Sequence, residues 1–421
     1  MKFIHAADIH LDSPLVGLQR YEGAPIEEIR GATRRALENL VELAITESVD
    51  FILISGDLYD GDWKDYNTGL FFAAQMGKLR ENGIKVFIIS GNHDAVSQIT
   101  KFLRFPENVK QLSVHKTESL ILDDLSVVIH GRGFHSRTIT ENMVKDYPPP
   151  IPHLFNIGML HTSAEGREGH EIYAPCSLQD LLSKNYDYWA LGHVHKYEVL
   201  HKEPWVLFPG NIQGRHSRET GAKGCLLVTV EDGKVFKVEQ RELDVLRWSI
   251  CKVDAAESPT IDDAMERVVA AVNRELSNSD GRSLAVRLQI DCSSGARSEI
   301  SADIEQWVNQ IRAMVTDLSS GRVWIEKVKI STHTTTSLGE ALGRDDALGG
   351  LLRAVHGLNL DDRLFVSLKK DLTDLMSKLP PELRTGEEAI DLENPQLLQQ
   401  VTEDVKQLLF ARILSSEKGN L

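Results

Sequence analysis

The chain of 421 residues has 42% hydrophobic and 26% charged residues, a composition typical of a globular protein with two or three domains. No apolar run approaches the roughly 20 residues that span a bilayer, and the first residues lack the long hydrophobic segment of a secretory signal. Cys176, Cys225, Cys251 and Cys292 are scattered without Cys-x-x-Cys spacing, which disfavours a zinc site or a disulfide framework. We therefore expect a cytoplasmic protein without a membrane segment.

The charge balance is acidic, with 47 basic and 62 acidic side chains and a net charge of −15. This balance opposes nucleic-acid binding, because Lys and Arg hold phosphate backbones. Bound divalent metals neutralise carboxylates, however, and net charge says little about a local cleft. The charge therefore predicts that the chain binds nucleic acid weakly unless bound metals or a partner protein contribute.

The first 90 residues alternate short apolar runs with segments of helical periodicity. Strands are expected at residues 3–7, 51–54 and 86–90, with helices at 29–48 and 68–82 between them. This β-α-β-α-β order predicts helices that cover a sheet.

Beyond residue 114 the pattern changes to a series of short strands. They are predicted at 127–130, 157–161, 188–191, 205–208, 225–230 and 235–238. The Pro-Pro-Pro run at 148–150 belongs to an extended loop, because proline disrupts the interior of a helix or a strand. We expect residues 1–243 to form an α/β sandwich of mixed sheets flanked by helices.

A domain boundary is predicted near Asp244. Apolar runs at 248–253, 284–290 and 323–330 alternate with helical patterns at 262–276 and 300–318, as in a compact α+β unit. We expect this unit to be a second, smaller domain at residues 244–333.

The remainder of the chain has helical character. Residues 334–342 resemble a linker, and amphipathic patterns follow at 345–355, 363–379 and 396–414. We expect a C-terminal helical segment over 343–421.

Five polar motifs occur in chain order within the first 200 residues, most of them directly after a predicted strand. They are Asp8-Ile9-His10, Gly56-Asp57-Leu58-Tyr59-Asp60, Gly91-Asn92-His93-Asp94, His161 and Gly192-His193-Val194-His195. Strand ends gather in one crevice of an α/β sheet, so these side chains are expected to converge. Their oxygen and imidazole donors suit Mn²⁺, Fe²⁺ or Zn²⁺ and disfavour a pure Ca²⁺ or Mg²⁺ site.

The number of candidate ligands indicates two metals that share one carboxylate. Two neighbouring metals activate a water molecule and neutralise phosphate oxygens, while a positioned histidine protonates the leaving alkoxide. The motifs therefore predict phosphoester hydrolysis.

This motif set resembles the calcineurin-like metallophosphoesterase superfamily. The segments D-I-H-L-D-S-P, G-D-L-Y-D, G-N-H-D and G-H-V-H resemble its DNA-repair exonuclease branch, which includes SbcD-like enzymes and, more closely, YhaO-type bacterial exonucleases. The resemblance covers about residues 1–240. It implies a Mn²⁺-dependent 3′-to-5′ DNA exonuclease, with endonuclease activity left open. It also implies an SMC-like ATPase partner of the SbcC type, which would dock on the C-terminal segment, and a homodimer.

The resemblance also implies roles for individual residues. Asp8, His10 and His195 would hold one metal, Asn92, His161 and His193 would hold the other, and Asp57 would bridge them. His93 would be the general acid, oriented by Asp60, although some double-strand-break nucleases carry histidine at the latter position. Pro209-Gly210-Asn211 departs from the Pro-Gly-Ser of the branch, which leaves the substrate contact of this loop open.

Several further residues have two interpretations. Arg215, His216, Arg218 and Lys223 either contact substrate phosphates or belong to a solvated loop. Asp94 is either a helix N-cap, which we favour, or a group that supports the metal ligands.

His5 is expected to be a core histidine. Trp248, Trp307 and Trp324 are expected to be core anchors and not platforms for base stacking.

The motifs do not exclude a metal-dependent phosphodiesterase or phosphatase that acts on small molecules or phosphoproteins, because its metal chemistry is the same. G-N-H-D in place of G-N-H-E, together with the extra C-terminal residues, disfavours a protein phosphatase. A non-catalytic scaffold would have lost ligands, and this sequence retains the complete set.

Overall fold

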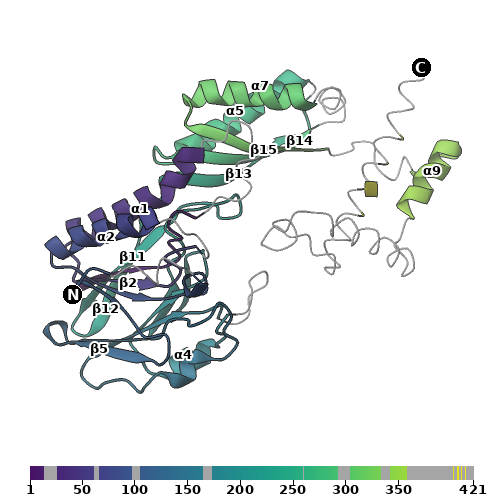
Figure 1. The fold of residues 1–421 in the computed structure, drawn as a ribbon. Coiled ribbons are helices and arrows are strands. Elements are labelled where there is room, and N and C mark those ends of the chain that lie inside the picture. Colours follow the sequence, from purple (N-terminus) through teal and green to yellow (C-terminus); the bar gives the residue numbers. More distant parts are fainter. Residues whose placement is uncertain are drawn as a thin grey trace. The chain divides into compact units, whose positions relative to one another are not determined.

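The computed structural model describes residues 1–13, 26–60, 66–96, 105–164, 173–258, 260–292, 304–332 and 342–357, with a few positions between 402 and 413. The chain divides into two compact units, Met1–Thr332 and His333–Leu421 (Figure 1). The first unit contains all five motifs.

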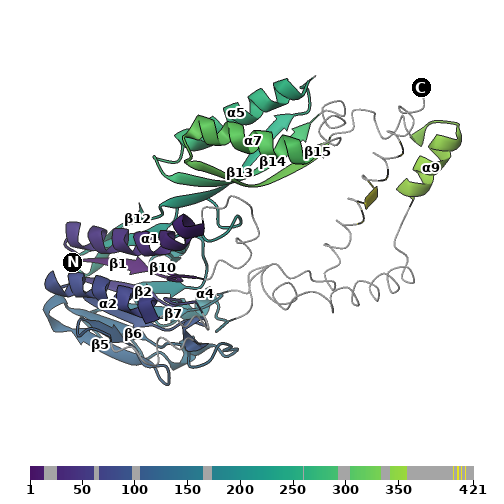
Figure 2. The same cartoon turned by 45° about the horizontal axis from the view of Figure 1, so that its top comes forward.

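The first sheet of this unit has the strand order β12-β11-β1-β2-β3-β4. Its parallel strands are β1 (Lys2–Ala6), β2 (Phe51–Ser55), β3 (Lys85–Ile89) and β4 (Val109–Gln111), and antiparallel β11 (Gly224–Glu231) and β12 (Lys234–Glu242) complete it. Helices α1 (Ile26–Thr46) and α2 (Tyr66–Glu81) cover its outer face through a buried apolar cluster (Figure 2).

The second sheet has the order β5-β6-β7-β8-β10-β9. Its strands are β5 (Glu118–Leu122), β6 (Val127–Gly131), β7 (Phe155–His161), β8 (Tyr188–Gly192), β9 (Glu198–Lys202) and β10 (Trp205–Phe208). The short helix α4 (Leu178–Leu182) and a 3-10 turn at Met143–Asp146 pack on its outer face.

The core between the two sheets is aromatic and aliphatic. Phe3, Phe51 and Phe87 of the first sheet pack against residues of the second, such as Met159 and Tyr188, and all five are at most 5% exposed. Burying large aromatic side chains contributes strongly to stability. The predicted α/β sandwich of two mixed sheets flanked by helices is confirmed.

The smaller third sheet consists of parallel β13 (Leu246–Ala255), β14 (Ser283–Cys292) and β15 (Val323–Thr332). Helices α5 (Ile261–Ser277) and α7 (Ile304–Ser319) pack on it through one apolar cluster. This arrangement agrees with the predicted β-α-β-α-β order.

The third sheet also contacts α1. Trp248 and Ala285 are buried against Ile29 and Ala32 of that helix, and Trp324 packs at the edge of the same cluster. Trp307 is partly buried against the core of the sheet. The tryptophans therefore serve as core anchors, as predicted.

In the second unit the structure describes mainly α9 (Ala347–His356). Its N-cap Asp346 accepts a hydrogen bond from the Gly349 N–H, and Leu352 and Val355 are buried. The predicted helix at 345–355 corresponds to α9. The predicted linker lies outside the described residues except for its last position, as do the helix at 363–379 and most of that at 396–414.

Among the described helices, none combines the length and apolar character needed to cross a membrane.

Candidate metal centre

The loops after β1, β2 and β8 are tied together by backbone hydrogen bonds. The Asp8 N–H donates to the Gly56 carbonyl and the His10 N–H to the Asp57 carbonyl, both at 3.0 Å. The His193 N–H donates to the Asp8 carboxylate at 3.0 and 3.1 Å. Three motifs that are far apart in sequence therefore form one rigid edge.

Two motif glycines allow these loops to approach closely. A Cβ atom on Gly91 would lie 2.8 Å from the Asp57 backbone nitrogen and would overlap its carboxylate. A Cβ atom on Gly192 would overlap the Ser55 carbonyl oxygen. The glycines are required because only a residue without a side chain fits this spacing.

Four candidate ligands adopt left-handed backbone conformations. The φ angles are 52° for Asp8, 45° for His10, 53° for Asp57 and 102° for His193. Such conformations cost on the order of 1–3 kcal/mol each in non-glycine residues and cluster at functional sites. The strain indicates that the loops are shaped for the position of these side chains and not for minimal backbone energy.

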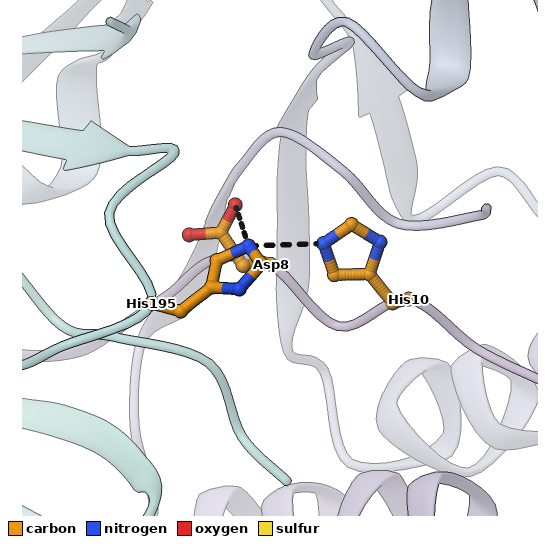
Figure 3. A group of neighbouring side chains, drawn as sticks. All are labelled: Asp8, His10 and His195. Atoms are coloured by element: carbon orange, nitrogen blue, oxygen red, sulfur yellow. Dashed lines mark hydrogen bonds and ion pairs between the residues drawn. The ribbon is translucent and has the colours of Figure 1, made fainter. Parts of the chain in front are cut away.

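The first ligand group consists of Asp8, His10 and His195 (Figure 3). The Nε2 atoms of His10 and His195 lie 3.2 Å apart, and the His195 Nε2 lies 3.9 Å from Asp8 Oδ1. Nitrogen ligands about 2.0–2.1 Å from one ion lie about 2.8–3.0 Å apart in octahedral geometry and about 3.3–3.4 Å apart in tetrahedral geometry. The spacing of the two imidazoles therefore fits a shared cation.

The second group consists of Asp57, His161 and His193, with Asn92 beside it. The His161 Nε2 lies 3.3 Å from Asp57 Oδ2 and 2.9 Å from Asn92 Oδ1. The other ring nitrogen of His161, Nδ1, hydrogen-bonds to the Ser55 carbonyl at 2.9 Å. A histidine held at one nitrogen in this way presents the other nitrogen to a metal.

Asp57 lies between the two groups. Its Oδ2 atom is 3.3 Å from the Nε2 of His161 and 3.9 Å from the Nε2 of His10. This is the position that a bridging carboxylate requires.

The buried carboxylates of the site also favour the binding of cations. Asp8 and Asp57 are each 1% exposed. Burial raises the pKa of Asp8; at Asp57 burial opposes ionisation, but the neighbouring His161 outweighs it and lowers the pKa. Burial lowers the pKa of His10 to about 3, which keeps this imidazole neutral with a lone pair available for a metal. At His161 burial alone would lower the pKa, but the charge of Asp57 raises it to about 9, so a protonated His161 compensates Asp57 when no metal is bound. Buried carboxylates need such a positive charge beside them. A cation can supply it in place of that proton, so the clusters are consistent with a dimetal site.

A third group lies next to the ligands and contains His93 and Asp60. The His93 Nδ1 lies 2.6 Å from Asp60 Oδ1. Asp60 Oδ2 accepts hydrogen bonds from the Ser13 hydroxyl and, at 3.2 Å, from Arg215 Nη1. The His93 side chain is 33% exposed, so this group opens towards solvent.

The acidic neighbours of His93 favour its protonated form. Burial alone would lower the pKa of His93, but the hydrogen bond to Asp60 and the charge of Asp57 outweigh burial and raise it. A histidine that holds its proton beside a carboxylate is suited to general acid catalysis. His10, Asp60 and His93 are also close enough together to hold a metal ion, which makes metal content a necessary control in any test of His93.

The structure thus brings all seven predicted ligands and the predicted His93–Asp60 pair together. The four residues predicted to contact substrate phosphates or to lie in a solvated loop differ in their surroundings. Arg215 faces Asp60 and Glu219, His216 Nε2 lies 3.5 Å from Glu219, and Arg218 is exposed. Lys223 is buried, and its ammonium donates to the His195 carbonyl at 2.8 Å.

The structure supports the second interpretation of Asp94, a group that supports the metal ligands, and does not test its role as a helix cap. Its carboxylate accepts hydrogen bonds from the N–H groups of Gly91, Leu58 and Tyr59, and so braces two motif loops against each other. The helix expected from about residue 96 lies outside the described residues beyond the 3-10 turn Asp94–Val96.

His5 is a core histidine, as predicted. It is fully buried and hydrogen-bonds to the Tyr188 hydroxyl and the Leu191 carbonyl.

Sequence reasoning missed Glu219 and Ser13. Glu219 Oε1 lies 2.6 Å from the His195 Nδ1, and Ser13 bonds to Asp60. Ser13 lies within a motif-like segment, but no spacing in the sequence indicates Glu219.

Comparison with known families gives two matches. The family described as Calcineurin-like phosphoesterase matches residues 1–197, and the family described as Metallophosphoesterase YhaO, middle domain, matches residues 248–333. The first match contains strands β1 to β8, and the second contains most of the third sheet with its two helices.

Two curated relatives resemble the chain over similar lengths. It is 40% identical over 262 residues to the uncharacterized metallophosphoesterase YhaO of Bacillus subtilis, which covers 61% of this chain and 64% of that protein. It is 26% identical over 282 residues to the DNA double-strand break repair protein Mre11 of Methanopyrus kandleri, which covers 59% of this chain and 58% of that protein. The chain thus spans less than two thirds of the length of either relative.

Among solved structures, a dimetal phosphatase from Danio rerio matches with 11% identity and a TM-score of 0.32, over 55% of this chain and 93% of that chain. This likeness is too low to support a functional conclusion.

Proposed function

Since the chain belongs to the calcineurin-like phosphoesterases, and is therefore a metal-dependent phosphoesterase, we propose that it is a two-metal DNA exonuclease. We propose 3′-to-5′ polarity, with endonuclease action as a second activity of the same site. One observation carries the proposal: two ligand groups share Asp57, and the His93–Asp60 pair lies directly beside them.

The residues divide between metal binding and proton transfer. Asp8, His10 and His195 would hold one metal, and Asn92, His161 and His193 the other, with Asp57 between them. Two bound divalent metals supply an activated water and positive charge around the phosphate. We propose Mn²⁺ as the native ion, because the resemblance to the exonuclease branch implies it; the mixture of carboxylate, amide and imidazole donors also suits Fe²⁺ and Zn²⁺.

His93 would protonate the leaving group. Hydrolysis of DNA expels an alkoxide, which is a poor leaving group until it receives a proton. Asp60 engages the Nδ1 atom of His93, so Nε2 is the ring nitrogen that would donate. The hydrogen bonds from Arg215 and Ser13 keep the Asp60 carboxylate in place for this task.

Two observations support DNA as the substrate. The motif sequences resemble those of the exonuclease branch, and one relative is named as a DNA double-strand break repair protein. We propose that residues 244–333 cap the site and contribute to DNA recognition. The acidic charge of −15 predicts a weak grip, so we also propose that an SMC-like ATPase partner docks on residues 343–421 and that the chain acts as a homodimer. Light scattering and co-purification with such an ATPase test these two assemblies.

A substrate panel tests the activity. The protein with Mn²⁺ is given end-labelled linear duplex DNA, single-stranded DNA, bis(para-nitrophenyl) phosphate and para-nitrophenyl phosphate. We expect metal-dependent shortening of DNA from its 3′ ends and turnover of the diester. Robust monoester turnover without DNA degradation would instead support a phosphatase that acts on small molecules or phosphoproteins.

A further inference from the structure

Glu219 is a buried carboxylate beside the metal centre. It lies in the loop between β10 and β11 and is 6% exposed. A buried carboxylate is retained only when hydrogen bonds or charges compensate it. Its partners therefore indicate what it does.

One oxygen of Glu219 serves a candidate metal ligand. Oε1 lies 2.6 Å from the Nδ1 of His195, whose Nε2 points towards His10 and Asp8 (Figure 3). A carboxylate on the far nitrogen of a metal-binding histidine fixes the tautomer and the ring orientation, and it raises the basicity of the ligating nitrogen.

The other oxygen is held by the same loop. Oε2 accepts the Arg215 N–H at 2.7 Å and the Asn211 side-chain amide at 2.9 Å. Asn211 is the residue that stands where the exonuclease branch has serine, and its longer side chain supplies this donor. The carboxylate thus cannot rotate away from His195.

Arg215 connects this carboxylate to the candidate acid. Its guanidinium lies 3.6 Å from Glu219 Oε1 and 3.2 Å from Asp60 Oδ2. One loop thus braces a metal ligand through Glu219 and the His93–Asp60 pair through Arg215. The carboxylates of Glu219 and Asp60 support different groups. Among the described contacts, Glu219 touches the first ligand group, through His195, and neither the second ligand group nor His93.

We propose that Glu219 is a positioning residue that sets the affinity of one metal position, the one formed by Asp8, His10 and His195. This inference rests on the proposed dimetal centre. It predicts an asymmetry: loss of Glu219 weakens one metal and leaves the other unchanged.

The test is a Co²⁺ titration of the full-length, metal-free protein, followed by calorimetry and by visible absorption of the bound ion. In Glu219→Gln the side chain keeps its size, but its NH₂ group must face either the Asn211 and Arg215 donors or His195. We expect affinity for one equivalent of Co²⁺ to fall by about 10–100-fold, with a changed absorption band, while the second equivalent binds as in the wild type. Asn211→Ala should give a smaller loss at the same equivalent.

Glu326→Gln is the matched control. Glu326 is 4% exposed and pairs with Arg287 at 2.6 and 2.8 Å in the third sheet, so its loss also removes a buried ion pair. Metal affinities should be unchanged in this variant. Unchanged binding in Glu219→Gln, or equal weakening of both equivalents, would overturn the inference alone. A wild-type protein that binds no Co²⁺ would overturn the metal centre as well.

Discussion

Replacing His93 with alanine should separate metal binding from proton donation. The Nδ1 atom of His93 lies 2.6 Å from Asp60, and the side chain is 33% exposed, so Nε2 is available to a substrate. General acid catalysis contributes about 10²–10⁴-fold, which is about 2.7–5.5 kcal/mol of transition-state stabilisation. We expect kcat for DNA hydrolysis to fall by this factor.

The size of the loss should depend on the leaving group. An alkoxide needs a proton as it departs, whereas para-nitrophenolate is stable as an anion near neutral pH. The His93→Ala variant should therefore lose much less activity towards bis(para-nitrophenyl) phosphate than towards DNA. Asp60→Asn should show the same trend in weaker form, because it removes the charge that raises the pKa of His93.

Metal content decides between an acid and a ligand. Bound Mn²⁺, measured by atomic absorption, should stay at the wild-type level in His93→Ala, and His115→Ala, which alters an exposed loop histidine, should match the wild type in every assay. Equal losses on both substrates, accompanied by loss of one metal, would show that His93 is a ligand and that the acid assignment is wrong.

Three further outcomes follow from the same geometry. Chelation should abolish hydrolysis and lower the melting temperature, because it removes the cations that compensate Asp8 and Asp57. Metal at 100 times its Kd should raise the free energy of unfolding by about 2.7 kcal/mol per site. A melting temperature that does not respond to metal would contradict this expectation. Gly91→Ala should lower the free energy of unfolding in urea by about 1–3 kcal/mol and reduce metal binding, because the new Cβ atom clashes with Asp57. The control Gly77→Ala places its Cβ atom in open space on α2 and should raise the free energy of unfolding by about 0.5–1 kcal/mol. Burial lowers the pKa of His5 to about 3 against an unfolded value near 6.5, so its contribution to stability is complete above pH 6.5 and is lost as the pH falls. Between pH 6.5 and pH 5 this loss is about 1.5–2 kcal/mol, and His5→Asn should show a correspondingly smaller pH dependence of urea unfolding, with equal slopes arguing against the assignment.

The strands that carry the motifs could be predicted because they are buried on both faces. Residues 51–54 form a continuous apolar run, and β2 has every position buried. β5 and β9 are absent from the prediction because no side chain in either strand is fully buried. The apolar residues of these short strands are consecutive, so the sequence lacks the apolar-polar alternation of a half-buried strand. Partial burial makes such strands depend on their neighbours in the sheet.

The candidate ligands could be predicted because they follow strands that the sequence itself predicts. Asp8, Asp57 and Asn92 each follow a parallel strand, and parallel strands place their carboxyl ends at one edge. Glu219 follows no such rule, since its loop reaches His195 through a turn after Pro209-Gly210 that no strand pattern encodes. The residues that support the ligands, Asp94 among them, are set by tertiary contacts between loops.

The acidic balance of the chain and the metal centre belong to one electrostatic argument. With His93 and His161 protonated, the side chains of Asp8, Asp57, Asp60, Glu219, Arg215, His93 and His161 have a formal charge of −4 + 3 = −1 in the metal-free crevice, in a chain whose net charge is −15. Without cations this crevice would repel a phosphodiester. Two divalent ions add +4 and replace the proton of His161, so the local charge becomes −1 + 4 − 1 = +2, and in a crevice with buried walls that charge is weakly screened. Substrate affinity is therefore tied to metal occupancy, because the crevice attracts phosphate only when the ions that perform the hydrolysis are bound.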